Sequence, residues 1–364
     1  MGFKCGIIGL PNVGKSTIFN ALTAAGAEVA NYPFCTINPN IGIVPVPDKR
    51  LEMITKIIKP GKVLYSNIEF HDIAGLVQGA SRGEGLGNKF LSHIREVDAI
   101  VHIVRCFENP SVSHVNGSID PIRDIETVNT ELILADLETL EKKISKTEKL
   151  TKLGDKHTQM ELETYNELQC ALDKGIPARH VSLNEKKLGI INDLHLLTCK
   201  KMLYVANVSE SQLREQRNSV HHIETIAYNE NSNLIIICGN LESEIMELPQ
   251  NEQEAFLHDL GLEESGLHKL IREGYHILGL ITFYTTVGPE LRAWTVRQGT
   301  SAPTAAGKIH SDMEKGFIRA EIIHFNDFIK IGNILKAKEL GRIRSEGKDY
   351  IMSDGDIAHF RFNV

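Results

Sequence analysis

The feature that most constrains the fold is an eight-residue motif close to the N-terminus. Residues 9–16 read GLPNVGKS, which satisfies the pattern G-x-x-x-x-G-K-[ST] in full. The apolar run FKCGII at residues 3–8 predicts a strand before the motif, and residues 16–25 predict a helix after it. A glycine-rich turn in this setting directs backbone N–H groups and the positive end of the helix dipole at phosphate oxygens. The sequence therefore predicts a phosphate-binding loop.

The polar residues of this motif have separate expected tasks. We expect Lys15 to neutralise the β- and γ-phosphates of a nucleoside triphosphate, which also makes it a candidate catalytic residue. We expect the Ser16 hydroxyl to ligate Mg²⁺. The residues expected to contact the nucleotide through this loop are Asn12, Val13, Gly14, Lys15, Ser16 and Thr17.

Two later segments have the spacing of nucleotide-sensing elements. Asp72-Ile-Ala-Gly75 ends a predicted strand, where P-loop proteins place an acidic residue that holds Mg²⁺ through water. Gly75 is then expected near the γ-phosphate, and the glycines that follow predict a stretch able to move. Thr36, in NYPFCTINPN, is the candidate hydroxyl that closes on Mg²⁺.

The base-recognition motif bears on which nucleotide binds. Guanine-specific members of this class use N-K-x-D at the end of a strand, whereas residues 207–210 read NVSE. Val208 replaces the lysine, and Glu210 carries its carboxylate one methylene further out. The Asn207 amide can satisfy the donor and acceptors of adenine, so selection of guanine is impaired, although GTP is not forbidden. After the next predicted strand, Cys238, Gly239 and Asn240 are expected to form the last base-contacting loop.

The remaining patterns predict an α/β fold with two additions. Nearly continuous runs of Ile, Val and Leu alternate with helical stretches, which is typical of a doubly wound, mostly parallel sheet. We assign residues 1–124 and 201–280 to this nucleotide-binding domain. Apolar residues at helical spacing predict an inserted, coiled-coil-like helical hairpin over residues 125–200. Residues 281–364 predict a small α+β module. The predicted strands after residue 8 are 66–72, 99–106, 201–206 and 233–238.

Composition restricts the compartment and the partners. The chain has 364 residues, no apolar stretch long enough to span a membrane, and six cysteines without metal-site spacing. We therefore expect a cytoplasmic protein with free thiols and no membrane partner, most simply a monomer. The net charge of −7 gives no general reason to expect nucleic acid as a partner.

With these residues in place, the whole chain resembles the YchF subfamily of Obg-related P-loop proteins, the Obg-like ATPases. The motifs that carry the resemblance are GLPNVGKS, DIAGL, NVSE, RAWT, AAGKIH, EKGFIRAEI and DGDIAHFRFNV. The resemblance implies that the C-terminal module is a TGS domain. It also implies an ATP hydrolase that prefers ATP over GTP, associates with ribosomal RNA or a ribosomal protein, and is linked to translation and stress responses.

Two further roles come from the resemblance. The residue after the D-x-x-G motif is Leu76, where many relatives have a glutamine that orients the attacking water. Leucine cannot do this, and the family's candidate for the task is a loop histidine that maps to His114. Asn12 corresponds to an asparagine that helps to coordinate K⁺ in some relatives.

Three readings of function remain open from the sequence. In the first, slow ATP hydrolysis switches the protein between conformations. In the second, ATP occupancy gates binding to the ribosome and hydrolysis is incidental. In the third, the enzyme is a GTPase.

Overall fold

The computed structural model describes residues 3–29, 40–73, 86–110, 112, 114–115, 117–151, 155–214, 218–287 and 289–363. The chain divides into two compact units. The first unit comprises Phe3–Gly42 and Glu69–Leu270, and the second comprises Ile43–Ile68 and the chain from Ile271 onward.

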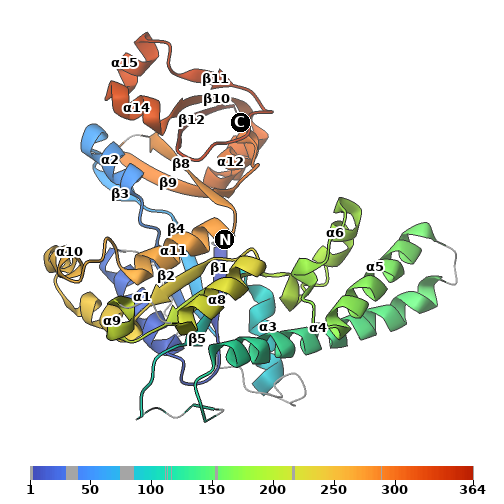
Figure 1. Ribbon diagram of the computed structural model, residues 1–364. Coiled ribbons are helices and arrows are strands. Elements are labelled where there is room, and N and C mark those ends of the chain that lie inside the picture. Colours follow the sequence, from blue (N-terminus) through green and yellow to red (C-terminus); the bar gives the residue numbers. More distant parts are fainter. Residues whose placement is uncertain are drawn as a thin grey trace. The chain divides into compact units, whose positions relative to one another are not determined.

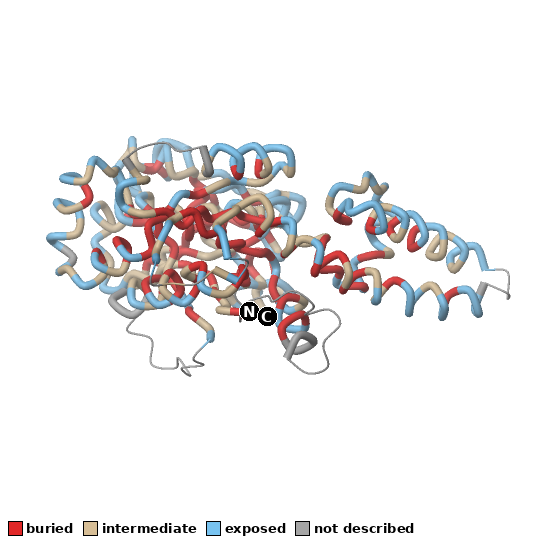
Figure 2. The backbone as a smooth tube through the Cα atoms, turned by 60° about the horizontal axis from the view of Figure 1, so that its bottom comes forward, coloured by how far each residue is buried: buried red, intermediate tan, exposed pale blue. Residues whose placement is uncertain are grey.

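The first unit contains a sheet with the strand order β2-β4-β1-β5-β6-β7. Strands β1, β5, β6 and β7 pair in parallel. Every residue of β5 is buried, so helices or loops cover both faces of the sheet at this point. Figure 2 shows the same concentration of buried residues along the central strands. The predicted doubly wound, parallel fold is confirmed. The strands are β1 Phe3–Ile8, β2 Ile41–Pro45, β4 Asn67–Asp72, β5 Ala99–Arg105, β6 Lys201–Asn207 and β7 Leu234–Ile237.

Helices alternate with these strands along the chain (Figure 1). Helix α1 packs beside α9, while α8 packs on β6 and β7. No helix within the described ranges combines the length and apolar character that crossing a bilayer requires. The α-helices outside the hairpin are α1 Lys15–Val29, α3 Leu86–Glu96, α6 Glu185–Asn192, α7 Glu210–Arg214, α8 Asn218–Asn229, α9 Gly239–Glu247, α10 Gln250–Asp259 and α11 Gly266–Ile277, and the short 3-10 turns are Ala178–His180 and Leu197–Cys199.

The predicted helical hairpin consists of α4 (Pro121–Thr151) and α5 (Lys156–Asp173), which extend away from the sheet (Figure 1). Their facing sides share a core that includes Leu140, Leu168 and Leu172, so the apolar spacing in the sequence identified the buried stripe. The middle of α4 is fixed by the buried carboxylate of Asp136, which accepts hydrogen bonds from the Leu197 and Thr198 N–H groups and the Thr198 hydroxyl.

The second unit contains a mixed sheet with the strand order β11-β10-β12-β8-β9-β3. Two cores lie against it: one contains the apolar residues of α12, and the other those of α2 and α14. Consecutive residues of β9 contribute to different cores, as the alternation of side chains along a strand requires. The elements are α2 Lys49–Ile58, β3 Lys62–Leu64, β8 Leu280–Val287, β9 Glu290–Arg297, α12 Ala302–Ile309, α13 Ser311–Lys315, β10 Phe317–His324, α14 Phe325–Ile331, α15 Ile334–Glu339, β11 Arg344–Glu346 and β12 Asp356–Phe362.

The observed units differ from the expected domain boundaries at residues 43–68. The sequence analysis assigned this segment to the nucleotide-binding domain, but it packs in the second unit. Leu51 and Ile54 of α2 are fully buried in the core that contains Phe328. Strand β3 also pairs in parallel with β9. An amphipathic pattern shows that α2 has a buried face, but it does not show which core receives that face.

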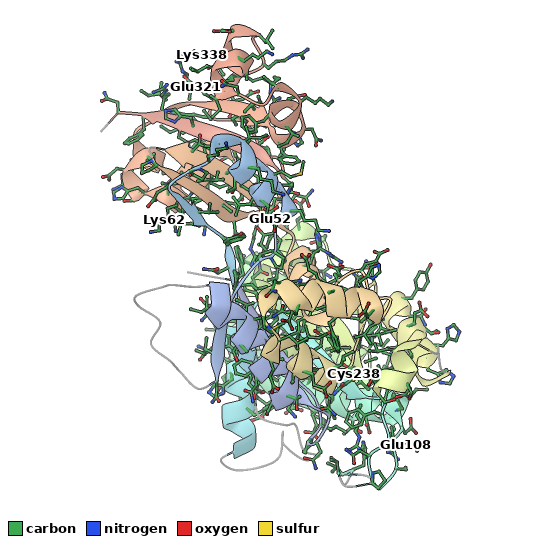
Figure 3. All side chains as sticks on the ribbon, turned by 90° about the vertical axis from the view of Figure 1, so that its left-hand side faces the viewer. Glu52, Lys62, Glu108, Cys238, Glu321 and Lys338 are labelled. Carbon is green, nitrogen blue, oxygen red and sulfur yellow. The ribbon has the colours of Figure 1, made fainter. Side chains whose placement is uncertain are left out.

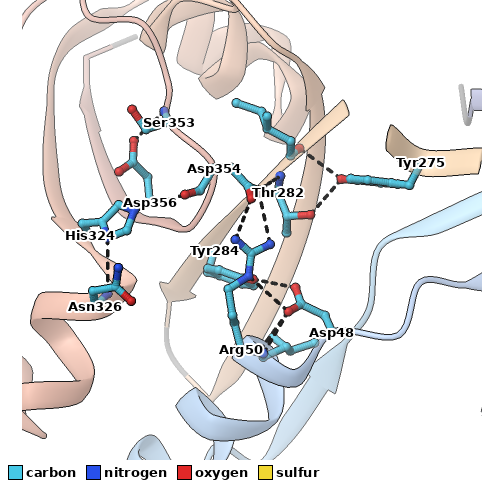
Figure 4. A network of polar contacts seen from close by, with 12 residues as sticks. Asp48, Arg50, Tyr275, Thr282, Tyr284, His324, Asn326, Ser353, Asp354 and Asp356 are labelled. Carbon is cyan, nitrogen blue, oxygen red and sulfur yellow. Dashed lines mark hydrogen bonds and ion pairs between the residues drawn. The ribbon is translucent and has the colours of Figure 1, made fainter. Parts of the chain in front are cut away.

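A polar network fixes this segment within the second unit (Figure 4). The Asp48 carboxylate caps α2 by accepting the Arg50 and Leu51 N–H groups, and it also accepts the Tyr284 hydroxyl at 2.5 Å. The Arg50 guanidinium donates to both carboxylate oxygens of Asp354, at 2.7 and 3.2 Å. Burial, reinforced by the neighbouring Asp48 charge, raises the pKa of Tyr284, so its hydroxyl stays protonated and donates.

Replacing Tyr284 by phenylalanine is expected to destabilise the second unit by about 1–3 kcal/mol, because it leaves a buried carboxylate oxygen without its donor. Trp294 is the only tryptophan in the chain and lies in this unit, so its fluorescence during urea unfolding reports this transition. Tyr65→Phe is the matched control, since no hydrogen bond of that hydroxyl is recorded within the described residues. Equal unfolding free energies for the two variants would show that the Tyr284 hydroxyl does not hold the segment.

Candidate functional site

The backbone of residues 9–16 has the geometry that the motif predicts. Gly9 and Gly14 have φ angles of 152° and 95°, a region that side chains with a Cβ rarely adopt. A Cβ at Gly9 would collide with the Ile103 carbonyl, and one at Gly14 would collide with the Asn207 amide. Helix α1 begins at Lys15, which places its free N–H groups at the loop. The loop is therefore shaped by both glycines and by two neighbouring strand ends.

Lys15 is held inside this loop. Its ammonium donates to the Leu10 carbonyl at 2.8 Å, and the residue is 8% exposed. Burial lowers the pKa of Lys15 to about 8, and the nearby Asp72 charge partly opposes that shift. A negatively charged phosphate next to this ammonium would stabilise its protonated form.

The residues present suit a magnesium ion. The Ser16 hydroxyl lies 3.4 Å from Asp72 Oδ2, which brings together two of the three side chains that the sequence predicted around the metal. The other oxygen, Asp72 Oδ1, is buried and has no hydrogen-bond partner among the described residues. Burial raises the pKa of Asp72, against the opposing effects of Lys15 and Ser16. A hydroxyl and a carboxylate with an unused oxygen are the ligand types that Mg²⁺ prefers.

A pocket of about 250 Å³ opens beside the loop. It lies where the carboxyl ends of β5, β6 and β7 meet, the usual place for ligands in a doubly wound sheet. The structure thus brings together the predicted base-contacting residues Asn207, Val208, Glu210 and Cys238, while Gly239 starts α9 beside them. Asn240, which was expected in the last base-contacting loop, also lines the pocket. The sequence analysis missed the other lining residues, which are Phe107, Glu108, Asn109, Ser209, Leu241 and Glu244. Figure 3 labels Glu108 and Cys238.

Asn207 also has a structural task that the motif did not reveal. Its amide Nδ2 donates to the Val13 carbonyl at 2.9 Å, and its Oδ1 accepts the Gly239 N–H at 3.0 Å. The side chain therefore ties the phosphate loop to the loop after β7. One amide hydrogen is left for a base, since the NH₂ group carries two donors.

His114 is buried against an acidic partner. Its Nε2 lies 2.8 Å from Asp124 Oδ2, and the side chains are 4% and 2% exposed. Burial raises the pKa of Asp124, although the hydrogen bond from His114 works in the opposite direction. When Asp124 is ionised it accepts a hydrogen bond from Nε2–H, which fixes the proton of the neutral ring on Nε2. The sequence singled out His114, but nothing in the local pattern identified Asp124 as its partner.

Two predicted site residues, Thr36 and Gly75, lie outside the described residues. The described cysteines Cys5, Cys106, Cys170, Cys199 and Cys238 are free thiols.

Two family models match separate parts of the chain. Residues 4–153 match the family model MMR_HSR1, described as a 50S ribosome-binding GTPase. Residues 280–363 match YchF-GTPase_C, described as a protein of unknown function.

Relatives match over the full length. A protein of Bacillus subtilis named "Ribosome-binding ATPase YchF" is 53% identical over 366 residues, covering 100% of both chains. One of the same name from Escherichia coli O157:H7 is 51% identical over 364 residues, again covering 100% of both. The solved structure titled as the Schizosaccharomyces pombe YchF GTPase has a TM-score of 0.90 at 37% identity, and the match covers 99% of this chain and 98% of that one. A phosphate loop, a base pocket at the strand ends and about half of all residues shared over the full length show that this protein belongs to the YchF family.

Proposed function

We propose that this protein is a Mg²⁺-dependent ATPase that associates with the ribosome and acts in translation and stress responses. The observation that carries the proposal is the continuity of the phosphate loop with the base pocket. Asn207 belongs to both, since it holds the Val13 carbonyl and lines the pocket. The full-length relatives are named ribosome-binding ATPases, and from these names the proposal takes ATP as the ligand and the ribosome as the partner.

In this proposal the chain's own groups bind and orient the triphosphate. The N–H groups of the phosphate loop and the Lys15 ammonium contact the phosphates, while Ser16 and Asp72 would hold Mg²⁺. The metal would neutralise phosphate charge as the bond to the γ-phosphoryl group breaks. Thr36 and Gly75 complete the set of proposed contacts around the metal and the γ-phosphate.

We assign K⁺ to Asn12 as a second cation. Asn12 is exposed and has a left-handed backbone with φ of 62°, next to the phosphate-binding turn. Its side-chain carbonyl is a hard oxygen ligand, which suits an alkali cation that offsets transition-state charge.

His114 is the proposed catalytic base, because Leu76 has no polar group with which to orient water. With the imidazole proton held on Nε2 by Asp124, Nδ1 is the ring nitrogen whose lone pair would accept the proton of the attacking water once the loop has rearranged. His114 has to approach the γ-phosphate for this step, so nucleotide binding is coupled to a rearrangement of the part of the loop beyond Val112 that carries His114.

The partner surface is assigned to the second unit. A cavity of about 480 Å³ there is lined by Arg292, Trp294, His359 and Arg361, among others. The Arg292 guanidinium stacks over the Trp294 ring at 3.9 Å, an arrangement on which a nucleobase of ribosomal RNA can stack in turn. The nucleotide state would then control ribosome affinity, either through hydrolysis or, in the alternative, through occupancy alone.

Nucleotide preference is the first test. Calorimetric titration with non-hydrolysable ATP and GTP analogues, with Mg²⁺ in KCl and again in NaCl, is expected to show ATP preferred by about tenfold or more, or roughly 1.4 kcal/mol. Glu210→Asp restores the acidic residue of the guanine motif and is expected to narrow that preference. Glu247→Asp makes the same change on the exposed side of α9. It is the control and is expected to leave the ATP preference unchanged. Equal or tighter GTP binding by the wild type would instead establish the GTPase alternative. Equal single-turnover rates of ATP hydrolysis in KCl and NaCl would exclude a role for K⁺.

The role of His114 is tested by single-turnover ATP hydrolysis. Loss of a general base costs about 10²–10⁴-fold in rate, so His114→Ala is expected to hydrolyse ATP at least about 100-fold more slowly with analogue affinity retained. His221→Ala, an exposed histidine on α8, is expected to behave as the wild type. A His114→Ala rate equal to that of the wild type would exclude His114 as the base.

The pKa of Lys15 predicts a pH dependence of ATP binding. A lysine whose pKa is lowered to about 8 is charged below that pH and neutral above it. ATP affinity is therefore expected to be flat up to about pH 8 and then to fall by up to about tenfold per pH unit, because binding must restore the proton. Lys15→Arg, which stays charged throughout, is expected to flatten this profile. Parallel profiles for the two proteins would assign the dependence to another group.

A further inference from the structure

One buried cation in the first unit has no role in the function described so far. Arg105 ends β5, after a run of apolar residues, and is 1% exposed. In the parallel register it stands opposite Asn207 on β6, the residue that holds the phosphate loop. A charged side chain at the end of a buried strand and beside a phosphate site needs a physical reason, because burial of a cation costs free energy unless its donors are satisfied.

The donors of Arg105 are satisfied by backbone carbonyls from two separate loops. Its Nε donates to Phe107 O at 3.1 Å, and its Nη2 donates to Val112 O at 3.1 Å and Asn109 O at 3.4 Å. Its Nη1 reaches across to Asn12 O, at 3.4 Å. The guanidinium also lies 4.7 Å from the centroid of the Phe107 ring. The recorded partners of this cation are thus four carbonyls and an aromatic face.

These four carbonyls belong to the parts of the site that have to be aligned. Asn12 lies in the phosphate loop, next to Val13, whose carbonyl Asn207 holds. Two neighbouring strand ends therefore fix two successive carbonyls of that loop. Phe107 and Asn109 line the base pocket, and Val112 precedes His114 by two residues.

We propose that Arg105 is a positioning residue for ATP hydrolysis, which sets the loop that carries His114 against the phosphate loop. This inference rests on the ATPase activity proposed above. The planar guanidinium explains why arginine is used: it presents five N–H donors in a fixed fork, and so it can bind carbonyls on two loops at once. Lysine keeps the charge and the aliphatic stem, but its three donors sit on one atom and cannot span the same set.

The test compares single-turnover ATP hydrolysis with binding of a non-hydrolysable ATP analogue in full-length variants with Mg²⁺. Arg105→Lys is expected to lower the hydrolysis rate by at least about tenfold while the analogue's dissociation constant changes less, because an interaction needed only in the transition state affects rate more than binding. Arg95→Lys is the matched control and is expected to keep the wild-type rate. The Arg95 guanidinium also bonds to a carbonyl and a hydroxyl, those of His195 and Thr139.

The same change in a His114→Ala background separates positioning from a general structural role. If Arg105 acts through the His114 loop, adding Arg105→Lys to His114→Ala slows hydrolysis by less than about twofold, since effects of residues that act as a unit are not additive. An equal rate loss in both backgrounds, or a wild-type rate for Arg105→Lys alone, would overturn the proposal.

A second variant covers the case in which the lysine variant does not fold. Arg105→Met keeps the stem and leaves no uncompensated charge inside the protein, so it avoids the main cost of breaking a buried ionic site. It is expected to show the same rate loss, and thermal unfolding followed by circular dichroism verifies that it is folded. Failure of the proposed function is distinguishable from failure of this inference. It would appear as absent ATP hydrolysis by the wild type or as an unchanged rate in His114→Ala, and neither result involves an Arg105 variant.

Discussion

The site depends on the hydrogen bonds that hold the carbonyl groups of the phosphate loop. A loop that directs its N–H groups at phosphate leaves its carbonyls pointing back into the protein, where each needs a donor. The Asn207 amide supplies one for Val13, and the Arg105 guanidinium supplies one for Asn12. The Asn207 contact also explains Gly14, because a Cβ there would occupy the position of the amide. The proposed phosphate and base sites therefore share the same two strand ends.

Most of the fold was predictable from the sequence because its signals are local. The continuous apolar run of β5 indicated a strand covered on both faces, and the four- and three-residue spacing along α4 indicated the hairpin core. Residues 43–68 could not be assigned in the same way. The buried face of α2 is visible in the pattern, but the choice between two cores depends on Phe328 and Tyr284, more than 200 residues away in the chain.

In the candidate site, too, some residues could be predicted from local sequence motifs and others could not. Lys15, Ser16 and Asp72 follow from motifs whose spacing reflects the chemistry, and the structure brings the last two to within 3.4 Å of each other. The partners of these residues do not follow from spacing. Asp124 lies ten residues after His114 with no motif to mark it, and the pocket residues on the loop after β5 become neighbours of Glu210 only when β5 and β6 pair. An arginine at the end of a strand that is apolar apart from His102 was the one available signal for Arg105.

The path of the chain gives the second unit a direct connection to the nucleotide-sensing segments. The chain leaves the first unit after Gly42, six residues beyond Thr36, and returns at Glu69, three residues before Asp72. Between these points it is fixed in the second unit by the Asp48–Tyr284 and Arg50–Asp354 contacts. Such anchoring resists displacement of either end, because the polar network and the α2 core have to be disturbed before the segment can slide. Displacement of the backbone before Ile43 or after Ile68 would therefore be transmitted to the second unit along the chain itself.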